Sequence, residues 1–457
     1  MMRFHDEGDA ITYIFRSIRR VRDLPRGADE FARDVTPTRR LLAGCGLTTH
    51  TRICEYAVVT GSKGKGSTVA IAAKLLQHLG HTVGMVTSPH LVEYRERIRV
   101  NGRMISESDF LRILDRLAPE IDRIEAEFTG AQYFSPQGIF LAIALMWFDE
   151  QGVSAAVLEV GRGGRFDDMA VVPNKLSLFT PILLEHVAQL GDTLERIAWH
   201  KAGIIKPRSY AYSVPQASSV LDVFQAEADA HDAEFAWIAP NDLGQYVGRH
   251  ANGIVMSLGR YGEIPMSMHG MVELENATLA VQGVGSMHGR LPGIAHQAPA
   301  YSAAIRAGLG DVTWPGRMQR LGESPEVWID AATTPRAARM MLASLAHLLD
   351  GSRPVAAVIG TPIDRDYAGV YATLAPKVDR IILTSTDINP NVRFPAPDAA
   401  LTAARAVHEQ VEYAPNLATA LDRARESVGR DGVVLLAVTL PLVGEAMLLY
   451  GLRFEVI

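Results

Sequence analysis

A glycine-rich turn between a β-branched run and a helical run carries the residues of this sequence best suited to chemistry. Val58-Val59-Thr60 leads into Gly61-Ser62-Lys63-Gly64-Lys65-Gly66-Ser67-Thr68, after which a helix is predicted over Val69–Leu79. Closely spaced glycines let backbone N–H groups converge on an anion, and a helix N-terminus attracts negative charge. Lys65 adds a mobile cation, and Ser67 or Thr68 offers a hydroxyl to Mg2+. The turn is predicted to bind the phosphates of a nucleoside triphosphate; the alternative is a βα turn that binds nothing.

The length of this turn and the motifs that follow it resemble a known family. The turn is two residues shorter than the common G-x-x-x-x-G-K-[ST] form. It resembles the loop G-T-N-G-K-G-S-T of the folylpolyglutamate synthase and dihydrofolate synthase branch of the Mur ligase superfamily. Further matches are Thr87–Leu91, Glu96–Gly102, Leu158–Arg165, Leu190–Leu194, Lys201–Pro207 and Trp314–Arg317. The resemblance implies that ATP contacts Gly61, Ser62, Gly64, Lys65, Gly66, Ser67 and Thr68.

Length and composition exclude several classes of partner. The chain has 457 residues, 48% of them hydrophobic and 21% charged, so two or three globular domains are expected. A net charge of −6 with mixed signs predicts no nucleic-acid partner. No apolar run reaches the roughly 18 residues of a membrane span and no signal peptide is evident, so no membrane partner is predicted. Only Cys45 and Cys54 are present, which favours a reducing compartment, interpreted as the cytoplasm.

The order of strand-like and helical runs predicts an α/β protein with two domains. In the first part, the buried strands Ala155–Val160 and Leu176–Thr180 and the capped helix Thr193–Ala202 indicate a parallel sheet. Segment 235–271 is interpreted as a β-rich appendage and segment 286–299 as a loop. The predicted domains are 1–312, a P-loop ATP-binding domain, and 313–457, a smaller Rossmann-like C-terminal domain. In the latter the strands are Glu326–Ala331, Val355–Gly360, Arg380–Thr384 and Val433–Thr439, and the helices are Pro335–Leu349, Tyr367–Leu374 and Asn416–Val428.

An amphipathic helix is predicted near residue 1. Ile11, Ile14, Phe15, Ile18 and Val21 recur at helical spacing, and the arginines between them are expected to face solvent. Acidic residues in the same segment argue against a transit or membrane role.

The resemblance implies a set of metal-binding and catalytic residues. Glu159 follows a buried strand and corresponds to a Mg2+ ligand, as do Ser67 and Ser88, whose hydroxyl oxygens suit a hard cation. His186 corresponds to a metal-binding histidine. Lys201 corresponds to a lysine that is typically carboxylated, and burial would supply the neutral amine that reacts with CO2. Lys65, Lys201 and His186 are the predicted catalytic residues.

Each of these residues also has a structural interpretation. Glu159 would instead form an ion pair with Arg162 or Arg165, because buried carboxylates need partners. Ser88 would belong to a simple turn before a proline, and His186 would be a structural histidine. The Lys201 amine would reach solvent from a core helix.

Residues beyond the first motifs are expected to complete the nucleotide site. Arg317 and Asp330 match family residues that reach the nucleotide from across the cleft, and Asn276 resembles an adenine-side asparagine. An arginine on a moving domain supplies charge to the phosphates only when the cleft closes. Outside the resemblance, these residues would be interpreted as solvated polar groups or local ion pairs.

The substrate-binding motifs depart from the family pattern. Thr333 stands in the place of a family histidine and Thr439 in the place of a family serine, positions that help bind the incoming glutamate in folylpolyglutamate synthases. Neither threonine supplies positive charge, so glutamate is predicted to be disfavoured as the amine. On the acid side, Asp167 matches a family residue. Asp168 adds a negative charge that a metal or Arg165 would have to offset.

Together these features predict an ATP- and Mg2+-dependent ligase that activates a carboxylate as an acyl phosphate for attack by an amine, expected to be an amino acid. Phosphate and metal residues persist while substrate residues differ, which favours a non-standard acid and amine pair. The alternatives are a genuine folylpolyglutamate or dihydrofolate synthase that adds glutamate, and a nucleotide-binding scaffold without turnover. The expected partners are small-molecule substrates, and a monomer is expected, with a dimer as the alternative.

Overall fold

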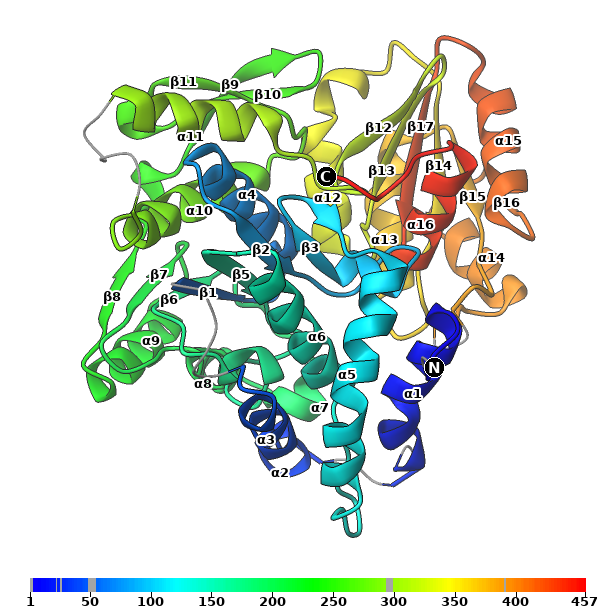
Figure 1. The fold of residues 1–457 in the computed structure, drawn as a ribbon. Coiled ribbons are helices and arrows are strands. Elements are labelled where there is room, and N and C mark those ends of the chain that lie inside the picture. The colour runs from blue at the N-terminus through cyan, green and yellow to red at the C-terminus, as the bar shows by residue number, and fades with distance from the viewer. Residues whose placement is uncertain (1–2, 22, 25–26, 48–54, 293–298, 390–391) are drawn as a thin grey trace.

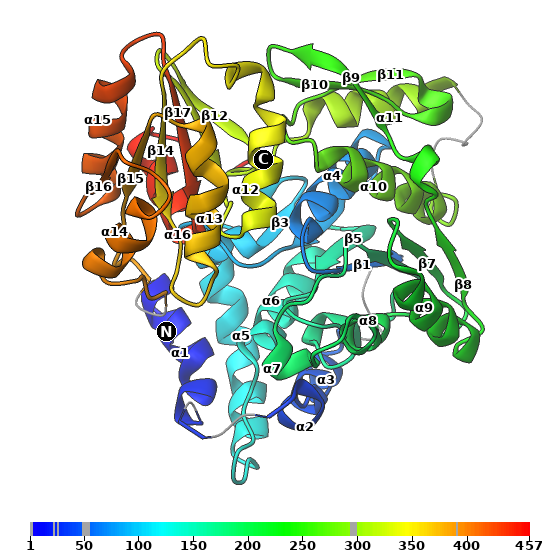
Figure 2. The same ribbon diagram turned by 180° about the vertical axis from the view of Figure 1, so that it is seen from behind.

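Two sheets, each covered by helices on both faces, form the two halves of the molecule (Figures 1 and 2). The structure is a computed structural model that describes all of the chain except residues 1–2, 22, 25–26, 48–54, 293–298 and 390–391. Cys54 therefore lies outside the described residues. The predicted α/β class, with a P-loop sheet and a smaller second domain, is confirmed. The boundary between residues 312 and 313 stays a prediction.

The larger sheet has eight strands in the order β4-β3-β2-β5-β1-β6-β7-β8. All pairs from β2 to β8 are parallel, and β3 and β4 form an antiparallel edge. The central strands are apolar throughout because both faces are buried: Val58 packs into one core, and Ala57 and Val59 into the other. The strands are β1 Glu55–Thr60, β2 Val83–Val86, β3 Ile98–Val100, β4 Arg103–Met104, β5 Ala155–Glu159, β6 Leu176–Phe179, β7 Tyr210–Ser213 and β8 Glu234–Trp237.

Helices cover the two faces of this sheet in separate groups. One core is shared by α1 (Glu7–Arg20), α3 (Thr36–Gly44), α5 (Glu107–Glu125), α6 (Pro136–Glu150), α8 (Leu194–Ala202) and α9 (Ser218–Ala230). The other core is formed with α4 (Lys65–His78), α10 (Glu273–His288) and α11 (Pro299–Asp311). The short helices α2 (Asp29–Ala32) and α7 (Val187–Leu190) lie in connections. The phosphate-loop helix α4 thus lies on the sheet beside α10, which packs on the same face.

The predicted β-rich appendage is a separate three-stranded antiparallel sheet, β11-β10-β9. Its strands are β9 Gln245–His250, β10 Gly253–Ser257 and β11 Glu263–Met266. The first residues of segment 235–271 do not belong to this sheet, because strand Glu234–Trp237 pairs with β7 and extends the large sheet.

The smaller domain contains a six-stranded sheet in the order β12-β13-β17-β14-β15-β16, parallel except for β12. Helices α12 (Pro335–Ser344), α13 (Tyr367–Leu374) and α14 (Pro397–Arg405) share the core on one face. Helices α15 (Leu417–Val428) and α16 (Leu440–Leu449) share the core on the other. The strands are β12 Gln319–Glu323, β13 Glu326–Asp330, β14 Val355–Gly360, β15 Arg380–Leu383, β16 Val411–Tyr413 and β17 Val433–Val438.

Several predicted boundaries are corrected by the structure. Helix α4 begins at Lys65 rather than Val69, because Gly64 adopts a left-handed conformation and acts as its N-cap. Helix α10 continues to His288, so only the later part of segment 286–299 is available for a loop, and residues 293–298 lie outside the description. The helix predicted over Pro335–Leu349 ends at Ser344 and is followed by a short 3-10 turn.

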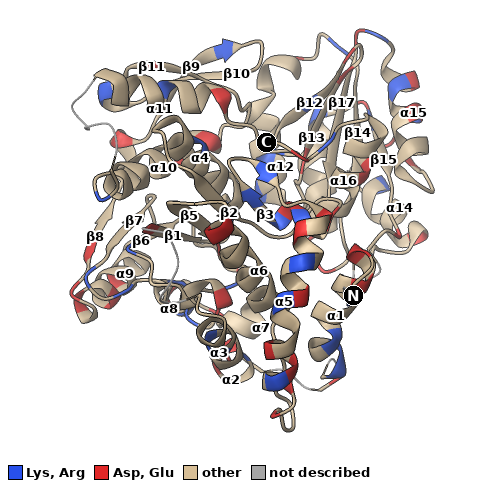
Figure 3. Cartoon of the chain, viewed as in Figure 1, with Lys and Arg blue, Asp and Glu red and all other residues tan. Residues whose placement is uncertain are grey.

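The predicted N-terminal helix is present as α1, but its basic face is not wholly solvated. Arg16 donates a 2.8 Å hydrogen bond to Asp122 on α5, and Ile14 is fully buried. Across the described residues, none of the helices combines the length and the apolar character that crossing a membrane requires. Acidic and basic residues are interspersed over both domains (Figure 3).

The chain passes between the halves a second time at residues 454–457. Phe454 packs into the core of the smaller domain, whereas Ile457 packs against the core of the larger one. Between them, the backbone N–H of Met104 donates to the carbonyl of Glu455, and that of Ile457 donates to the carbonyl of Gly102. This segment extends the β4 edge of the large sheet by an antiparallel bridge.

Candidate active site

A cavity of about 590 Å3 lies where the two domains meet. The glycine-rich loop forms one wall, with Ser62, Gly64, Lys65, Gly66 and Ser67 among its lining residues. Predicted residues from other elements line the same cavity: Ser88, Glu159, Asn276, Arg317, Asp330, Thr333 and Thr439. Most of the site predicted from sequence is therefore brought together in space.

Two glycines of the loop are required by its geometry. Gly61 has φ +143°, and a Cβ at this position would collide with the Thr180 hydroxyl. Gly64 has φ +88°, and a Cβ there would collide with the Asn276 side-chain oxygen. L-residues rarely adopt these φ values, and a Cβ at either position would also collide with a neighbouring side chain. Only glycine therefore allows the loop to pass this close to Thr180 and Asn276.

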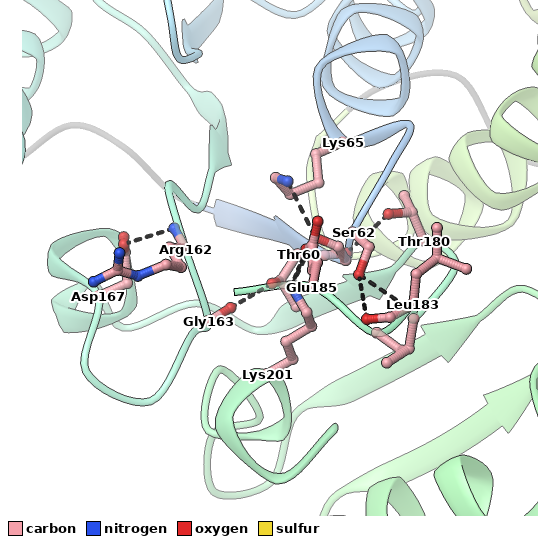
Figure 4. A network of polar contacts seen from close by, with 12 residues as sticks. Thr60, Ser62, Lys65, Arg162, Gly163, Asp167, Thr180, Leu183, Glu185 and Lys201 are labelled. Carbon is pink, nitrogen blue, oxygen red and sulfur yellow. Dashed lines mark hydrogen bonds and ion pairs between the residues drawn. The ribbon is translucent and has the colours of Figure 1, made fainter. Parts of the chain in front are cut away.

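Two lysines meet at one backbone carbonyl at the start of this loop (Figure 4). Lys65 donates from Nζ to Gly61 O at 3.0 Å, and Lys201 donates to the same oxygen at 2.8 Å. Lys201 is 1% exposed, and its Nζ lies 3.5 Å from Glu185 Oε1. Burial, and then the nearby charge of Lys65, lowers the pKa of Lys201 to about 7, while Glu185 opposes the shift. The amine points inward rather than to solvent, which contradicts the alternative of a solvent-directed lysine.

The hydroxyls of the α4 first turn are held by a polar pair on α10. Ser67 Oγ donates to Glu273 Oε1 at 3.1 Å, and Asn276 Nδ2 donates to Glu273 Oε2 at 2.9 Å. Thr68 Oγ1, which is fully buried, donates to Asn276 Oδ1 at 3.4 Å. Burial raises the pKa of Glu273 to about 7. Sequence reasoning missed Glu273, although its position one helical turn before Asn276 places both on the same face of α10.

Glu159 ends β5 at the cavity and is 5% exposed. Its Oε2 accepts a 2.9 Å hydrogen bond from the backbone N–H of Ser88. Burial raises its pKa, and the positive charges of Lys65, Arg317 and Arg97 oppose that shift. The alternative ion pairs are wrong, because Arg162 bonds to Asp29 and Arg165 bonds to Glu227.

His186 does not line the main cavity. It is the N-cap of α7 with φ +50°, next to Glu185, and burial lowers its pKa. In the part of the chain that the structure describes, no three His, Cys, Asp or Glu side chains gather as a metal site. The oxygens of Ser67, Ser88 and Glu159 do face one cavity, and such a hard donor set suits Mg2+, which keeps several waters and binds substrate phosphates. The role of His186 as a ligand stays a prediction.

Asp167 and Asp168 lie away from the main cavity, around a cation that the sequence did not single out. Arg33 donates to Asp167 Oδ2 at 3.1 Å and lies 3.7 Å from Asp168 Oδ2. Thr38 Oγ1 donates to Asp168 Oδ1 at 2.6 Å, and burial raises the pKa of Asp168 to about 6. Of the two groups named to offset Asp168, a metal or Arg165, Arg165 pairs with Glu227 instead, and Arg33 supplies the positive charge. Arg33 also lines a second cavity of about 320 Å3, with Leu24, Phe31 and Tyr133.

Replacing Arg33 with leucine is expected to destabilise the fold by about 3–5 kcal/mol at pH 8, because two buried carboxylates lose their shared cation. Urea denaturation measures the loss. Because Arg33 holds down the pKa of Asp168, its loss raises that pKa above the wild-type value of about 6, so the deficit should shrink as the pH falls from 8 toward 6. The control is Arg40→Leu, which breaks an exposed pair with Glu127 and should cost under about 1 kcal/mol. Equal losses for the two variants would contradict this account of Arg33.

The smaller domain supplies the opposite wall of the main cavity. Asp330 Oδ2 accepts a 2.9 Å hydrogen bond from the backbone N–H of Met318, which fixes it beside Arg317. Thr333 and Thr439 line this wall, but so do Arg336, Arg365 and Arg393. This wall therefore carries positive charge, although it comes from positions other than those of the two threonines.

A phosphate loop at the end of a parallel strand, facing an arginine and an aspartate on a second α/β domain, is the arrangement of an ATP-dependent acid–amino acid ligase. The family model for the "Mur ligase, glutamate ligase domain" matches residues 316–438.

Known proteins similar to the chain define the family more closely. The dihydrofolate synthase/folylpolyglutamate synthase of Mycobacterium tuberculosis is 32% identical over 390 residues, covering 81% of this chain and 78% of that protein. The corresponding Bacillus subtilis enzyme is 31% identical over 340 residues, covering 72% and 76%. A crystal structure of M. tuberculosis folylpolyglutamate synthase complexed with ADP and AMPPCP superposes with a TM-score of 0.81 at 28% identity, over 96% of this chain and 99% of that one. The chain belongs to the folylpolyglutamate synthase/dihydrofolate synthase family of Mur ligases.

Proposed function

We propose that the main cavity is where a carboxylic acid, phosphorylated by ATP to an acyl phosphate, is attacked by the amine of an amino acid. The observation that carries this proposal is the placement of the glycine-rich loop opposite Arg317 and Asp330 across one cavity. ATP phosphates would lie along the loop, with Lys65 near the transferred group. Arg317 would add positive charge from the second domain, and Asn276 would lie on the adenine side.

The oxygens of Ser67, Ser88 and Glu159 would hold Mg2+, which supplies charge neutralisation to the phosphates. Lys201 is proposed to be carboxylated, since its low pKa and burial favour a neutral amine. The carbamate would place an anion where the structure has a buried amine. This negative charge would be balanced by the positive charge of Lys65 nearby.

The substrate pair has two candidate assignments. Thr333 and Thr439 replace the family's histidine and serine, which supports a non-standard pair. The genuine folate assignment is equally supported by the relatives, and the arginines of the opposite wall suit an amine that carries extra carboxylates. The hypothesis of a scaffold without turnover is not favoured, since the chain belongs to a family of ligases. A cytoplasmic location and a monomeric state stay predictions.

A phosphate-release screen of the purified protein against a matrix of acids and amino acids is expected to find its best pair outside dihydropteroate or tetrahydrofolate with glutamate. The physical reason is that altered hydrogen-bonding groups at residues 333 and 439 change which amine is held in line for attack. A folate with glutamate as the best pair, at ordinary enzymatic efficiency, would establish the alternative. Phosphate release with no pair, despite ATP binding, would contradict the proposed activity itself.

A further inference from the structure

Glu273 is a buried carboxylate at the nucleotide site to which the proposed reaction assigns no part. It begins α10, is 2% exposed and lines the main cavity. Its two oxygens accept from two different residues, Ser67 on α4 and Asn276 on α10. Each of these residues has its own role in the proposed site, one toward the metal and one toward the adenine.

The orientation of the Ser67 hydroxyl decides whether it can bind a cation. A hydroxyl has one hydrogen and two lone pairs, and only its lone pairs can face a metal ion. A free hydroxyl rotates, and it loses part of its affinity for the cation when the hydrogen must first be turned away. In this structure the hydrogen is directed to Glu273 Oε1 at 3.1 Å, which leaves the lone pairs of Oγ unengaged by that bond.

We propose that Glu273 is a positioning residue: it fixes the Ser67 hydroxyl hydrogen so that Oγ presents its lone pairs to the metal of the bound nucleotide. The inference rests on the proposed function, because it takes Ser67 as a metal-binding group. The same carboxylate accepts from Asn276, whose side-chain oxygen accepts from Thr68. Ser67, Glu273, Asn276 and Thr68 thus join the first turns of α4 and α10 in one hydrogen-bonded unit.

A structural role for Glu273 makes a different prediction. A carboxylate in the first turn of a helix stabilises that helix through its charge, and this contribution requires the charge rather than a particular contact. Glu273→Asp keeps the charge but shortens the side chain by one methylene, so it loses the contact with Ser67. Glu273→Gln loses the charge but keeps an oxygen acceptor at the same reach. The two variants therefore separate positioning from helix stabilisation.

The test measures the affinity of AMPPCP for the full chain by calorimetry over a range of Mg2+ concentrations, with thermal unfolding of the free protein as a second measurement. Wild type is expected to bind the analogue more tightly as Mg2+ rises. Glu273→Asp should require about tenfold more Mg2+ for the same affinity, the scale of one lost hydrogen bond to a charged group. Glu273→Gln should require at most about threefold more Mg2+ than wild type, because it keeps an oxygen that can accept from Ser67 and a lost hydrogen bond would cost more than this.

Ser67→Ala supplies the decisive comparison, because Glu273 is argued to act through Ser67. In the Ser67→Ala background, Glu273→Asp should add no further change in Mg2+ dependence. Glu55→Gln is the matched control: Glu55 is also a buried carboxylate, but it pairs with Arg290 beyond the end of α10. It should alter thermal unfolding and leave the Mg2+ dependence unchanged.

The outcomes distinguish this inference from the proposed function. Glu273→Asp with wild-type Mg2+ dependence, or an Asp effect that persists in full without the Ser67 hydroxyl, would overturn the positioning role alone. Glu273→Gln as impaired as Glu273→Asp would also overturn it, because an oxygen acceptor at the same reach would then not be enough to orient the Ser67 hydroxyl. A wild-type protein whose AMPPCP affinity does not respond to Mg2+ would overturn both the metal assignment and the inference.

Discussion

Replacing Lys65 with alanine is expected to lower kcat by about 1,000-fold, the upper range seen when one charge-stabilising donor is removed from a transition state. Lys65 contributes little to packing: its Nζ contacts only the Gly61 carbonyl among the hydrogen bonds of the described residues, and it lies on the cavity wall. Steady-state phosphate release measures the loss, and thermal unfolding should show an intact fold.

Lys74→Ala is the matched control for Lys65. Lys74 lies on the same helix, about two and a half turns after Lys65, and pairs with Asp311 outside the cavity. Its replacement should leave kcat within about twofold, because Lys74 does not line the cavity; the half-buried amine loses its pair with Asp311 and its hydrogen bond to the Ile457 carbonyl, which affects stability rather than the site. A folded Lys65→Ala protein with the kcat of wild type would contradict the assignment of this loop as the phosphate-binding site.

Replacing Lys201 with methionine is expected to reduce kcat by about 100-fold while the protein remains folded. The pKa of Lys201 is about 7 in the folded protein, below its ordinary value, so the folded state binds fewer protons than the unfolded chain. The contribution of Lys201 to the free energy of unfolding therefore rises as the pH rises from about 7 to 10.5. Methionine carries no charge, so at pH 7 the variant does not bear the cost of burying a charged amine. Urea denaturation at pH 7 should find the variant at least as stable as wild type.

The carbamate itself is tested by its dependence on bicarbonate. Wild-type activity should rise with added bicarbonate above pH 7, where the amine is largely neutral and able to react with CO2. In Lys201→Ala, a short-chain carboxylic acid should restore part of the activity by placing a free carboxylate in the vacated space. Electron density for an unmodified amine in crystals grown at pH 8 with bicarbonate would rule the carbamate out.

The parts of the site that sequence predicted correctly are local in the chain. The loop from Gly61 to Thr68 specifies its own shape, because the glycine positions and the following helix are encoded in consecutive residues. The capping threonine at 193 likewise set the start of α8, where its hydroxyl accepts from the backbone of Arg196. Such features need no knowledge of the tertiary fold.

The residues that sequence missed are defined by contacts across the chain. Glu273 lies 206 residues from Ser67, and Arg33 lies 134 residues from Asp167. Arg33 has no local pattern that separates it from an ordinary surface charge, and Glu273 is marked only by its position one helical turn before Asn276. The arginines of the opposite wall are similar, because Arg336, Arg365 and Arg393 come from different segments and meet only around the cavity.

Helices α6 and α16 were not predicted, for a different reason. Helix α6 is buried on nearly every side, from Gly138 to Phe148, so its sequence lacks the alternation of apolar and polar faces that marks a surface helix. Helix α16 is similarly apolar around much of its circumference. Periodicity detects helices whose exposed face is polar; α6 has almost no exposed face, and the exposed end of α16 carries Leu448 and Leu449.

The second passage of the chain between the domains, at residues 454–457, turns the smaller domain into a body attached at two places. The first attachment is the linker between α11 and β12, and the second is the pairing of Glu455 and Ile457 with the β4 edge. The halves also touch elsewhere, since the Met271 backbone N–H donates to Ser344 Oγ and Leu91 packs on the core of the smaller domain, so a turn about the line that joins the two attachments would have to break those contacts. Arg317 lies in the first attachment, with Asp330 bonded to the neighbouring Met318, so both stay close to that line during such a turn. Arg365 belongs to neither attachment. Such a turn would move Arg365 relative to the glycine-rich loop more than it moves Arg317, so the cavity would widen mainly on its arginine-lined side.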